Sequence, residues 1–283
     1  MSIETKHLNL SFGETHVLND INVSIEDGEF VGVMGRTGCG KTSLMQLLAG
    51  LIRPTGGEVL IDGENIFAPR YDRKKLRRKL GFVFQFPEVQ LFETTVERDV
   101  TFALKHSGLS RIKMRERAVE SLAAVGFVGE SILEQSPLSL SGGQRRRIAV
   151  AGVLAQKPKI LILDEPLAGL DPTARREFLS LLRQLNKQEH TTILMISHNA
   201  DALAENCSRI LVLDEGCLLS DGTPQEIFFD ADALRARHLD VSFARQTAQL
   251  LQKGGFDVPQ NIVSRDALLE SVLHAFGREG GGA

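Results

Sequence analysis

The segment FVGVMGRTGCGKTSLMQLLAGL, residues 30–51, decides the fold of this chain. Phe30 to Met34 form an apolar, β-branched run that predicts a strand. The glycine-rich residues 35–40 predict a loop, and Ser43 to Leu51 show a helical pattern. A strand, a glycine-rich loop and a helix in this order predict an anion site, because the loop N–H groups and the helix N-terminus both present positive potential.

The loop fits the P-loop pattern, and its residue types suit phosphate binding. Glycines allow successive backbone N–H groups to curl around phosphate oxygens. Lys41 would reach the β- and γ-phosphates, and the hydroxyl of Thr42 would ligate Mg²⁺. The residues expected to bind the nucleotide are Gly35, Arg36, Thr37, Gly38, Cys39, Gly40, Lys41, Thr42 and Ser43.

Length and composition limit the class of protein. The 283 residues suit one α/β domain plus a small appendage, or two modest domains. A net charge of −3 gives no global field that would draw the chain to nucleic acid or anionic lipid. Three scattered cysteines offer no metal-binding pair and favour a reduced, cytoplasmic setting. The N-terminus lacks a signal-peptide pattern, and no apolar run approaches the ~20 residues of a membrane span.

The rest of the chain predicts a mostly parallel sheet covered by helices. Strands are expected within residues 3–34 and at 57–62, 80–84, 160–163, 192–196 and 210–213. A helical pattern from about 88 to 155, with amphipathic stretches at 95–107 and 111–125, indicates a helical insertion. The basic run 72–79 is interpreted as a solvated helical face. Further helices are expected at 225–236, 241–253 and 264–276.

The segment ILILDE, residues 160–165, predicts a second functional element. A buried strand ends in two adjacent acids, whose side chains would point to opposite sides of the chain. Asp164 would hold Mg²⁺ through water, and Glu165 would polarise the water that attacks the γ-phosphate. An apolar strand that ends in Asp-Glu is common, so this interpretation depends on the glycine-rich loop upstream.

A third segment, LSGGQ, precedes a helical run from Arg145 to Leu154 and therefore lies at a helix N-terminus, a second phosphate-binding geometry. Two such sites serve one triphosphate only if they act from opposite sides. The segment resembles the signature sequence of ABC ATPases, in which two domains pair head to tail. In that family the signature of one domain closes on the ATP held by the other. The signature residues here are Leu140, Ser141, Gly142, Gly143 and Gln144.

The resemblance implies an α/β fold of the P-loop NTPase class with an ABC-type nucleotide-binding domain. Such a domain has a mixed sheet core, an antiparallel β subdomain and a helical subdomain. We expect it over residues 1–225, with the helical subdomain at about 88–155. Residues 226–283 would form a small C-terminal helical extension that dimerises. The implied cofactors are ATP and Mg²⁺.

The same resemblance gives roles to four further residues. Gln85 matches the Q-loop glutamine that senses Mg²⁺ and the attacking water, so it is both a metal contact and a catalytic residue. His198 matches the catalytic switch histidine that contacts the γ-phosphate, and Asp171 matches the D-loop that crosses the dimer interface. Phe12 matches the aromatic on which adenine stacks, with a core phenylalanine as the alternative.

Cys39 departs from the family pattern, which usually has serine at this position. Both residues are small, so activity should survive the change. An exposed thiol of low pKa beside a helix N-terminus would be open to oxidation. The other residues that hydrolysis needs are present, and Glu165 and His198 in particular disfavour a non-hydrolysing regulatory subunit.

Residues 86–100, FPEVQLFETTVERDV, resemble the energy-coupling factor (ECF) ATPases of vitamin and transition-metal importers, especially the second of their two paired ATPases. A Gly-Phe-x-x-Pro step at residues 255–259 fits the helical extension of that group. In such importers the ATPases dock on a transmembrane coupling protein, which holds a separate substrate-binding membrane protein. The residues expected to line the docking groove, for a basic or apolar helix, are Glu88, Gln90, Leu91, Phe92 and Glu93.

The sequence therefore predicts an ATP-hydrolysing subunit of an ECF-type importer, at the cytoplasmic face of the cell membrane. Its predicted partners are a second ABC ATPase, either a related paralogue or a second copy, and the two membrane proteins, with no nucleic acid. A conventional ABC transporter ATPase is the alternative. A soluble ABC protein of DNA repair, translation or iron–sulfur assembly would carry coiled-coil insertions, tandem ATPase domains or a basic surface, and this sequence has none.

Apolar stripes in the last two predicted helices suggest how two subunits would stay together. A segment this short should not bury such stripes within itself, so they would pack on the ATPase core, on the tail of the partner, or on both. The stripe residues are Phe243, Leu250, Leu251, Leu268, Leu269, Val272 and Leu273.

Overall fold

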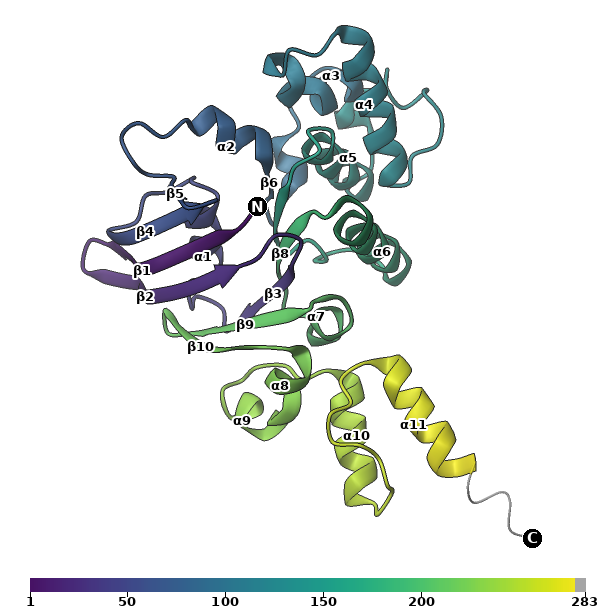
Figure 1. Cartoon of the computed structure of the whole chain (residues 1–283). Helices are drawn as coiled ribbons and strands as arrows, with labels where there is room; N and C mark the ends of the chain where they lie inside the picture. The colour runs from purple at the N-terminus through teal and green to yellow at the C-terminus, as the bar shows by residue number, and fades with distance from the viewer. Residues whose placement is uncertain (278–283) are drawn as a thin grey trace.

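The computed structural model describes residues 1–277, which form two sheets with helices around them (Figure 1). The N-terminal sheet is antiparallel, with strand order β2-β1-β4-β5. It corresponds to the antiparallel β subdomain that the sequence predicts. Its strands are β1 (Ile3–Phe12), β2 (Thr15–Ile25), β4 (Gly56–Ile61) and β5 (Glu64–Asn65).

The central sheet has six strands in the order β10-β9-β3-β8-β7-β6. Five of them pair in parallel, and β10 pairs antiparallel with β9, so the predicted mixed sheet is confirmed. Strand β10 is not predicted from the sequence, because most residues of this edge strand are exposed. The strands are β3 (Phe30–Gly35), β6 (Leu80–Val83), β7 (Ile160–Asp164), β8 (Thr192–Ile196), β9 (Arg209–Asp214) and β10 (Cys217–Gly222).

Alternate residues of the central strands enter two different hydrophobic cores, because successive side chains of a strand point to opposite faces. Ile160 and Ile162 belong to the core shared with the antiparallel sheet and α1 (Lys41–Leu48). Leu161 and Leu163 belong to the core shared with α5 (Gly142–Leu154), α6 (Pro172–Glu189) and α7 (Ala200–Asn206). Every residue of β3, β7 and β8 is buried, as expected for a sheet covered on both faces.

The segment between β6 and β7 forms the helical subdomain, whose buried side chains include Val96, Val100, Leu122 and Ile148. The stretch predicted at 95–107 starts as an α-helix and continues as a 3₁₀ helix. The elements of the helical subdomain are η1 (Pro87–Gln90), α3 (Val96–Thr101), η2 (Phe102–His106), α4 (Arg111–Ala124), η3 (Pro137–Ser139) and α5.

The basic run forms α2 (Arg73–Lys79), which the Asp72 side chain caps by accepting from Lys74 and Lys75. Leu76 is its one buried residue, so the predicted solvated helical face is confirmed. Within residues 1–277, no helix combines the length and the apolar character that crossing a membrane requires.

After β10 the chain forms α8 (Pro224–Phe229), α9 (Ala231–Ala236), α10 (Phe243–Lys253) and α11 (Arg265–Gly277), and its last six residues lie outside the described range. Phe228 and Leu234 enter the main core, so α8 and α9 pack on the sheet domain. In contrast, α10 and α11 share a small core of their own. This pair lies at the opposite end of the molecule from α3 and α4 (Figure 1).

The expectation that this segment could not bury its apolar stripes within itself is partly wrong. Leu268 is buried in the small core, and Leu251 and Val272 are partly buried against it. This core forms because the loop between α10 and α11 contributes Val258 and Ile262. The stripe residues that remain exposed are Phe243, Leu250, Leu269 and Leu273.

Candidate nucleotide site

The glycine-rich loop joins the C-terminal end of β3 to the N-terminus of α1. Gly35 is required by a close backbone approach, because a Cβ there would lie 2.3 Å from the carbonyl oxygen of Leu213. Gly40 has a φ of 102°, and a Cβ there would lie 2.9 Å from the carbonyl oxygen of Val17. The α1 helix begins at Lys41 with no side-chain cap, so its first N–H groups are available to an anion.

The Lys41 ammonium is buried and held above this loop. Its Nζ donates to the carbonyl oxygens of Gly35 and Arg36, each at 2.8 Å. The third donor of an ammonium group faces only a 4.0 Å contact with the Cys39 sulfur, a weak acceptor. A phosphate oxygen would be a stronger partner for that donor.

A cavity of about 230 Å³ lies over the loop and collects side chains from distant parts of the sequence. They meet because the parallel strands end at the same edge of the sheet. Val17 in β2 and Ile196 in β8 also line it, and neither carried a sequence signal that sets it apart from ordinary strand residues. The predicted residues that line the cavity are Thr37, Gly38, Gly40, Lys41, Thr42, Ser43, Gln85, Asp164, Glu165 and His198.

Asp164 and Glu165 both face this cavity, so the expectation that they point to opposite sides is wrong. Asp164 ends β7, and its Oδ2 accepts a hydrogen bond from Thr42 Oγ1 at 3.0 Å. Glu165 lies just beyond the strand, where a φ of 48° turns the backbone. The alternation of side chains holds only within a strand, which is why it failed at this residue.

Burial raises the pKa of both carboxyl groups. For Asp164, the hydrogen bond from Thr42 and the charge of Lys41 oppose this rise in pKa. For Glu165, His198 opposes it, and His198 Nε2 lies 3.3 Å from Glu165 Oε1. A glutamate with a raised pKa is a stronger base than an exposed one, which suits the activation of a water molecule.

The expectation of an exposed, easily oxidised thiol at Cys39 is wrong. The side chain is only 7% exposed, and a Cβ at Gly35 would lie 2.7 Å from its sulfur. Burial raises the pKa of the Cys39 thiol, and the nearby Lys41 charge opposes this rise only in part. A buried, neutral thiol is a poor nucleophile, so Cys39 acts here as a small packing residue.

The signature segment begins α5 and lies outside the cavity. The side chains of Ser141 and Gln144 form a capping box, in which Gln144 N donates to Ser141 Oγ at 3.3 Å and Ser141 N donates to Gln144 Oε1 at 2.9 Å. A Cβ at Gly142 or Gly143 would meet no atom of the described chain within 4 Å. Leu140 is buried and anchors the segment to the main core.

Two other predicted residues lie at element ends. Phe12, at the end of β1, is 58% exposed, so it is not a core residue. It is not among the described residues that line the cavity. Asp171 caps α6 by accepting from Thr173 N at 2.9 Å and Ala174 N at 3.0 Å, and these hydrogen bonds lower its pKa.

The predicted docking segment presents aromatic rather than acidic side chains. Leu91 packs against the main core, and Glu93 is paired with Lys105 at 2.8 Å, which lowers the Glu93 pKa. Gln90 is exposed, and Glu88 is partly buried. Phe92 and Phe102 contact each other edge to face with centroids 4.8 Å apart. We call the large exposed apolar side chains of residues 86–102 the docking patch, which consists of Phe86, Val89, Phe92 and Phe102.

A P-loop on a mixed sheet, an acidic pair at a strand end and a signature segment at a helix start together define an ABC-type nucleotide-binding domain. The family described as ABC transporter matches residues 18–168 of the chain. The energy-coupling factor transporter ATP-binding protein EcfA2 of Enterococcus faecalis is 42% identical over 263 residues, which is 92% of this chain and 90% of that protein.

Solved structures agree with this assignment. The cbiO1 protein of Clostridium perfringens, described as part of the ABC transporter complex cbiONQ, has a TM-score of 0.73 and 36% identity, and the match covers 83% of this chain and 93% of that one. An ATP-binding cassette solved as a dimer in a post-hydrolysis state, with ADP and Pi bound, has a TM-score of 0.70 and 30% identity. This match covers 78% of this chain and 98% of that one. The chain belongs to the ABC transporter family and, within it, to the ECF transporter ATP-binding proteins. It is an ABC ATPase, which binds and hydrolyses ATP.

Proposed function

We propose that this chain powers an ECF-type importer by hydrolysing ATP between its own P-loop cavity and the signature of a second ATPase subunit. One observation supports the proposal, namely that the signature residues do not line the cavity over the P-loop. Lys41, Thr42 and Glu165 line the cavity, whereas Ser141 lies outside it at the exposed start of α5. A signature that cannot reach the ATP of its own chain must close on the ATP of another.

Thr42, Asp164 and Gln85 are the proposed contacts of Mg²⁺. The Thr42 hydroxyl and the Asp164 carboxylate lie 3.0 Å apart, and Gln85 lines the same cavity. Hydroxyl, carboxylate and amide oxygens suit this hard cation. When bound, Mg²⁺ neutralises charge on the β- and γ-phosphates.

Glu165 is the proposed base for the attacking water, and its raised pKa suits it to accept a proton. His198, 3.3 Å from Glu165, is well placed to contact the γ-phosphate and to keep the Glu165 carboxylate aimed into the cavity. Lys41 and the loop N–H groups hold the phosphates. Phe12, exposed at the end of β1, is free to stack on adenine when nucleotide is bound.

The second ATPase subunit is a related paralogue or another copy of this chain. Asp171 caps the N-terminus of α6, six residues after Glu165, and would meet that subunit as the D-loop. Four exposed apolar residues of α10 and α11, which we call the tail face, supply a contact between the two subunits that does not depend on nucleotide. The tail face consists of Phe243, Leu250, Leu269 and Leu273.

The proposed membrane partners are a transmembrane coupling protein and the substrate-binding membrane protein that it holds. The docking patch adjoins Gln85 in sequence, so a coupling helix bound there would contact the loop that senses the nucleotide. This arrangement suits a peripheral subunit at the cytoplasmic face of the membrane. The cargo would be a vitamin or a transition-metal ion.

Purification of the tagged chain from membranes of its own cell tests this function. We expect a second ABC ATPase and two membrane proteins to co-purify in a complex that hydrolyses ATP and takes up its cargo. Lys41→Ala should keep the complex together but abolish uptake, because a phosphate countercharge is lost. Recovery of the chain without membrane proteins would contradict the proposal.

A further inference from the structure

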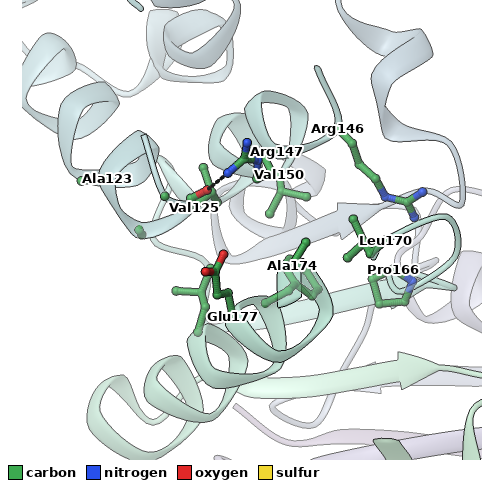
Figure 2. A pocket seen from close by; sticks show the side chains of 13 residues that line it. Ala123, Val125, Arg146, Arg147, Val150, Pro166, Leu170, Ala174 and Glu177 are labelled. Carbon is green, nitrogen blue, oxygen red and sulfur yellow. Dashed lines mark hydrogen bonds between the residues drawn. The ribbon is translucent and has the colours of Figure 1, made fainter. Parts of the chain in front are cut away.

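Three consecutive arginines, residues 145–147, follow the signature on α5, and they make very different contacts. Arg145 donates to the carbonyl oxygen of Leu140 at 3.1 Å, within its own segment. Arg147 donates to the carbonyl oxygen of Val125 at 3.5 Å and lies 4.8 Å from the Phe127 ring centroid. Figure 2 shows that Arg146 leaves the helix in another direction, toward Pro166 and Leu170.

Arg146 is only 8% exposed and binds three backbone carbonyls, two in the loop between β7 and α6 and one at Gln85, just after β6. Its Nη1 donates to Ala168 at 2.7 Å, and its Nη2 donates to Glu165 at 3.0 Å and to Gln85 at 3.2 Å. The rigid, planar fork of a guanidinium can satisfy several acceptors at fixed angles, which a lysine ammonium on a flexible stem cannot do. These contacts therefore depend on arginine and not only on positive charge.

The contact with Glu165 acts on a strained residue. A φ of 48° is uncommon for a residue with a side chain, and it persists only where neighbours hold the backbone. Glu165 N donates to the Ile196 carbonyl at 3.2 Å, and the Glu165 carbonyl accepts from both Ala168 N and Arg146. Arg146 thus supports the backbone turn that brings the Glu165 carboxylate into the cavity.

We propose that Arg146 is a positioning residue that couples the signature helix to the hydrolytic base of the same chain. The inference rests on the proposed roles of Gln85 and Glu165. Because Arg146 lies five residues after Ser141 on one rigid helix, a displacement of α5 moves three carbonyls together. ATP bound by the partner subunit and gripped by this signature is thereby sensed at this chain's own Glu165.

The test uses the full-length chain in its complex and compares Arg146→Lys with the matched control Arg147→Lys, one residue further along the same helix. We expect Arg146→Lys to lower kcat by about 10- to 100-fold, the usual cost of losing a supporting partner of a site residue. The KM for ATP and the affinity for ATP should stay unchanged, because the P-loop is untouched. Arg147→Lys should behave as the unchanged protein.

A double variant separates positioning from general support of the fold. Residues that act as a unit have non-additive effects, so Arg146→Lys should lower kcat little further once Glu165→Gln is present. Full additivity would overturn the proposal, as would an Arg146→Lys protein as active as Arg147→Lys. If Glu165→Gln alone keeps normal turnover, the proposed role of Glu165 fails instead.

Arg146→Gln is a second substitution for the case that Arg146→Lys does not fold. Glutamine keeps hydrogen-bond donors, but its side chain cannot span the three carbonyls. We expect the same loss of kcat with ATP affinity retained. If both substitutions at Arg146 lose ATP affinity together with kcat, Arg146 is a structural support only and the proposal is overturned.

Discussion

Glu165 owes its orientation and its basicity to tertiary structure. The left-handed turn at this residue depends on the Ile196 carbonyl and on Arg146, both remote in sequence. The rise in the Glu165 pKa depends on burial, which several elements create together. The Asp-Glu pair is therefore visible in the sequence, whereas the geometry that suits Glu165 to its proposed role as a base is not.

The pH dependence of hydrolysis follows from this residue. A base works when ionised, and burial raises the pKa of Glu165, so kcat should fall with decreasing pH already above the ~4.3 of an exposed glutamate. The acid limb reports Asp164 and Glu165 as a pair, because both carboxyl groups are buried and adjacent. A profile of kcat against pH measures the position of this acid limb.

ATP affinity of Glu165→Gln over the same pH range provides the control for that profile. Constant affinity would assign the acid limb to the chemical step. An acid limb at or below the ordinary glutamate value would contradict the raised pKa.

At the scale of elements, the 3₁₀ turn η1 and the helices after it form the docking patch. The sequence pattern 86–100 predicted a docking groove in this region, but it could not say which side chains face outward. Leu91 is partly buried against the main core, and Glu93 is paired with Lys105. Phe92, 66% exposed, is the most prominent aromatic of the patch.

Removal of this patch should separate docking from hydrolysis. Val89→Ser combined with Phe92→Ser should weaken association with the coupling protein by at least about 30-fold, as expected when an aromatic anchor is lost. Basal ATPase activity should persist, because neither side chain lines the cavity. Co-purification and a binding titration measure the effect.

Val128→Ser is the matched control, since this exposed apolar side chain also belongs to the helical subdomain but not to the patch. Equal weakening by the control, or unchanged assembly in the double variant, would show that the docking surface lies elsewhere.

At the scale of the whole molecule, α3, which the docking-patch residues flank in the sequence, lies at the opposite end from α10 and α11, which carry the tail face (Figure 1). In the proposed function, one end would contact the membrane partner while the other would hold two ATPase subunits together. The tail helices are tied to the sheet domain, because the Asp201 carboxylate in α7 accepts from Phe243 N at 2.6 Å and from Arg265 Nη2 at 2.9 Å.

A tail that joins two subunits should make the dimer independent of nucleotide. A chain cut after Val241 keeps Leu239 and Val241 in the main core. It should bind ATP, but sedimentation without nucleotide should show a monomer, with half the mass of a dimer. Leu250→Glu with Leu269→Glu should act in the same way, and the exposed Ile112→Glu should not. If all variants have the same mass as the full-length chain, alone and with a related ATPase, the tail only packs on its own chain and does not join two subunits.

The sequence predicted much of this architecture, because its motifs are local. The P-loop, the acidic pair and the signature each need only a few adjacent residues of defined type. Features that depend on three-dimensional packing were missed or misjudged, such as the buried Cys39 thiol and the core within α10 and α11. Arg146 carried one signal, its place two residues after the signature, but its contacts span residues 85–168.

The release rate of labelled ATP from Glu165→Gln tests the central claim, that the signature of one subunit closes on the ATP of the other. This variant should hydrolyse ATP about 10²–10⁴-fold more slowly, and its ATP should stay trapped in the closed pair. Adding Ser141→Arg should restore fast release while ATP still binds, although Ser141 is outside its own chain's cavity. Ser110→Arg, which removes the equivalent cap of α4, should leave the ATP trapped. Equal release rates with and without Ser141→Arg, in the presence of the partner ATPase, would contradict the account.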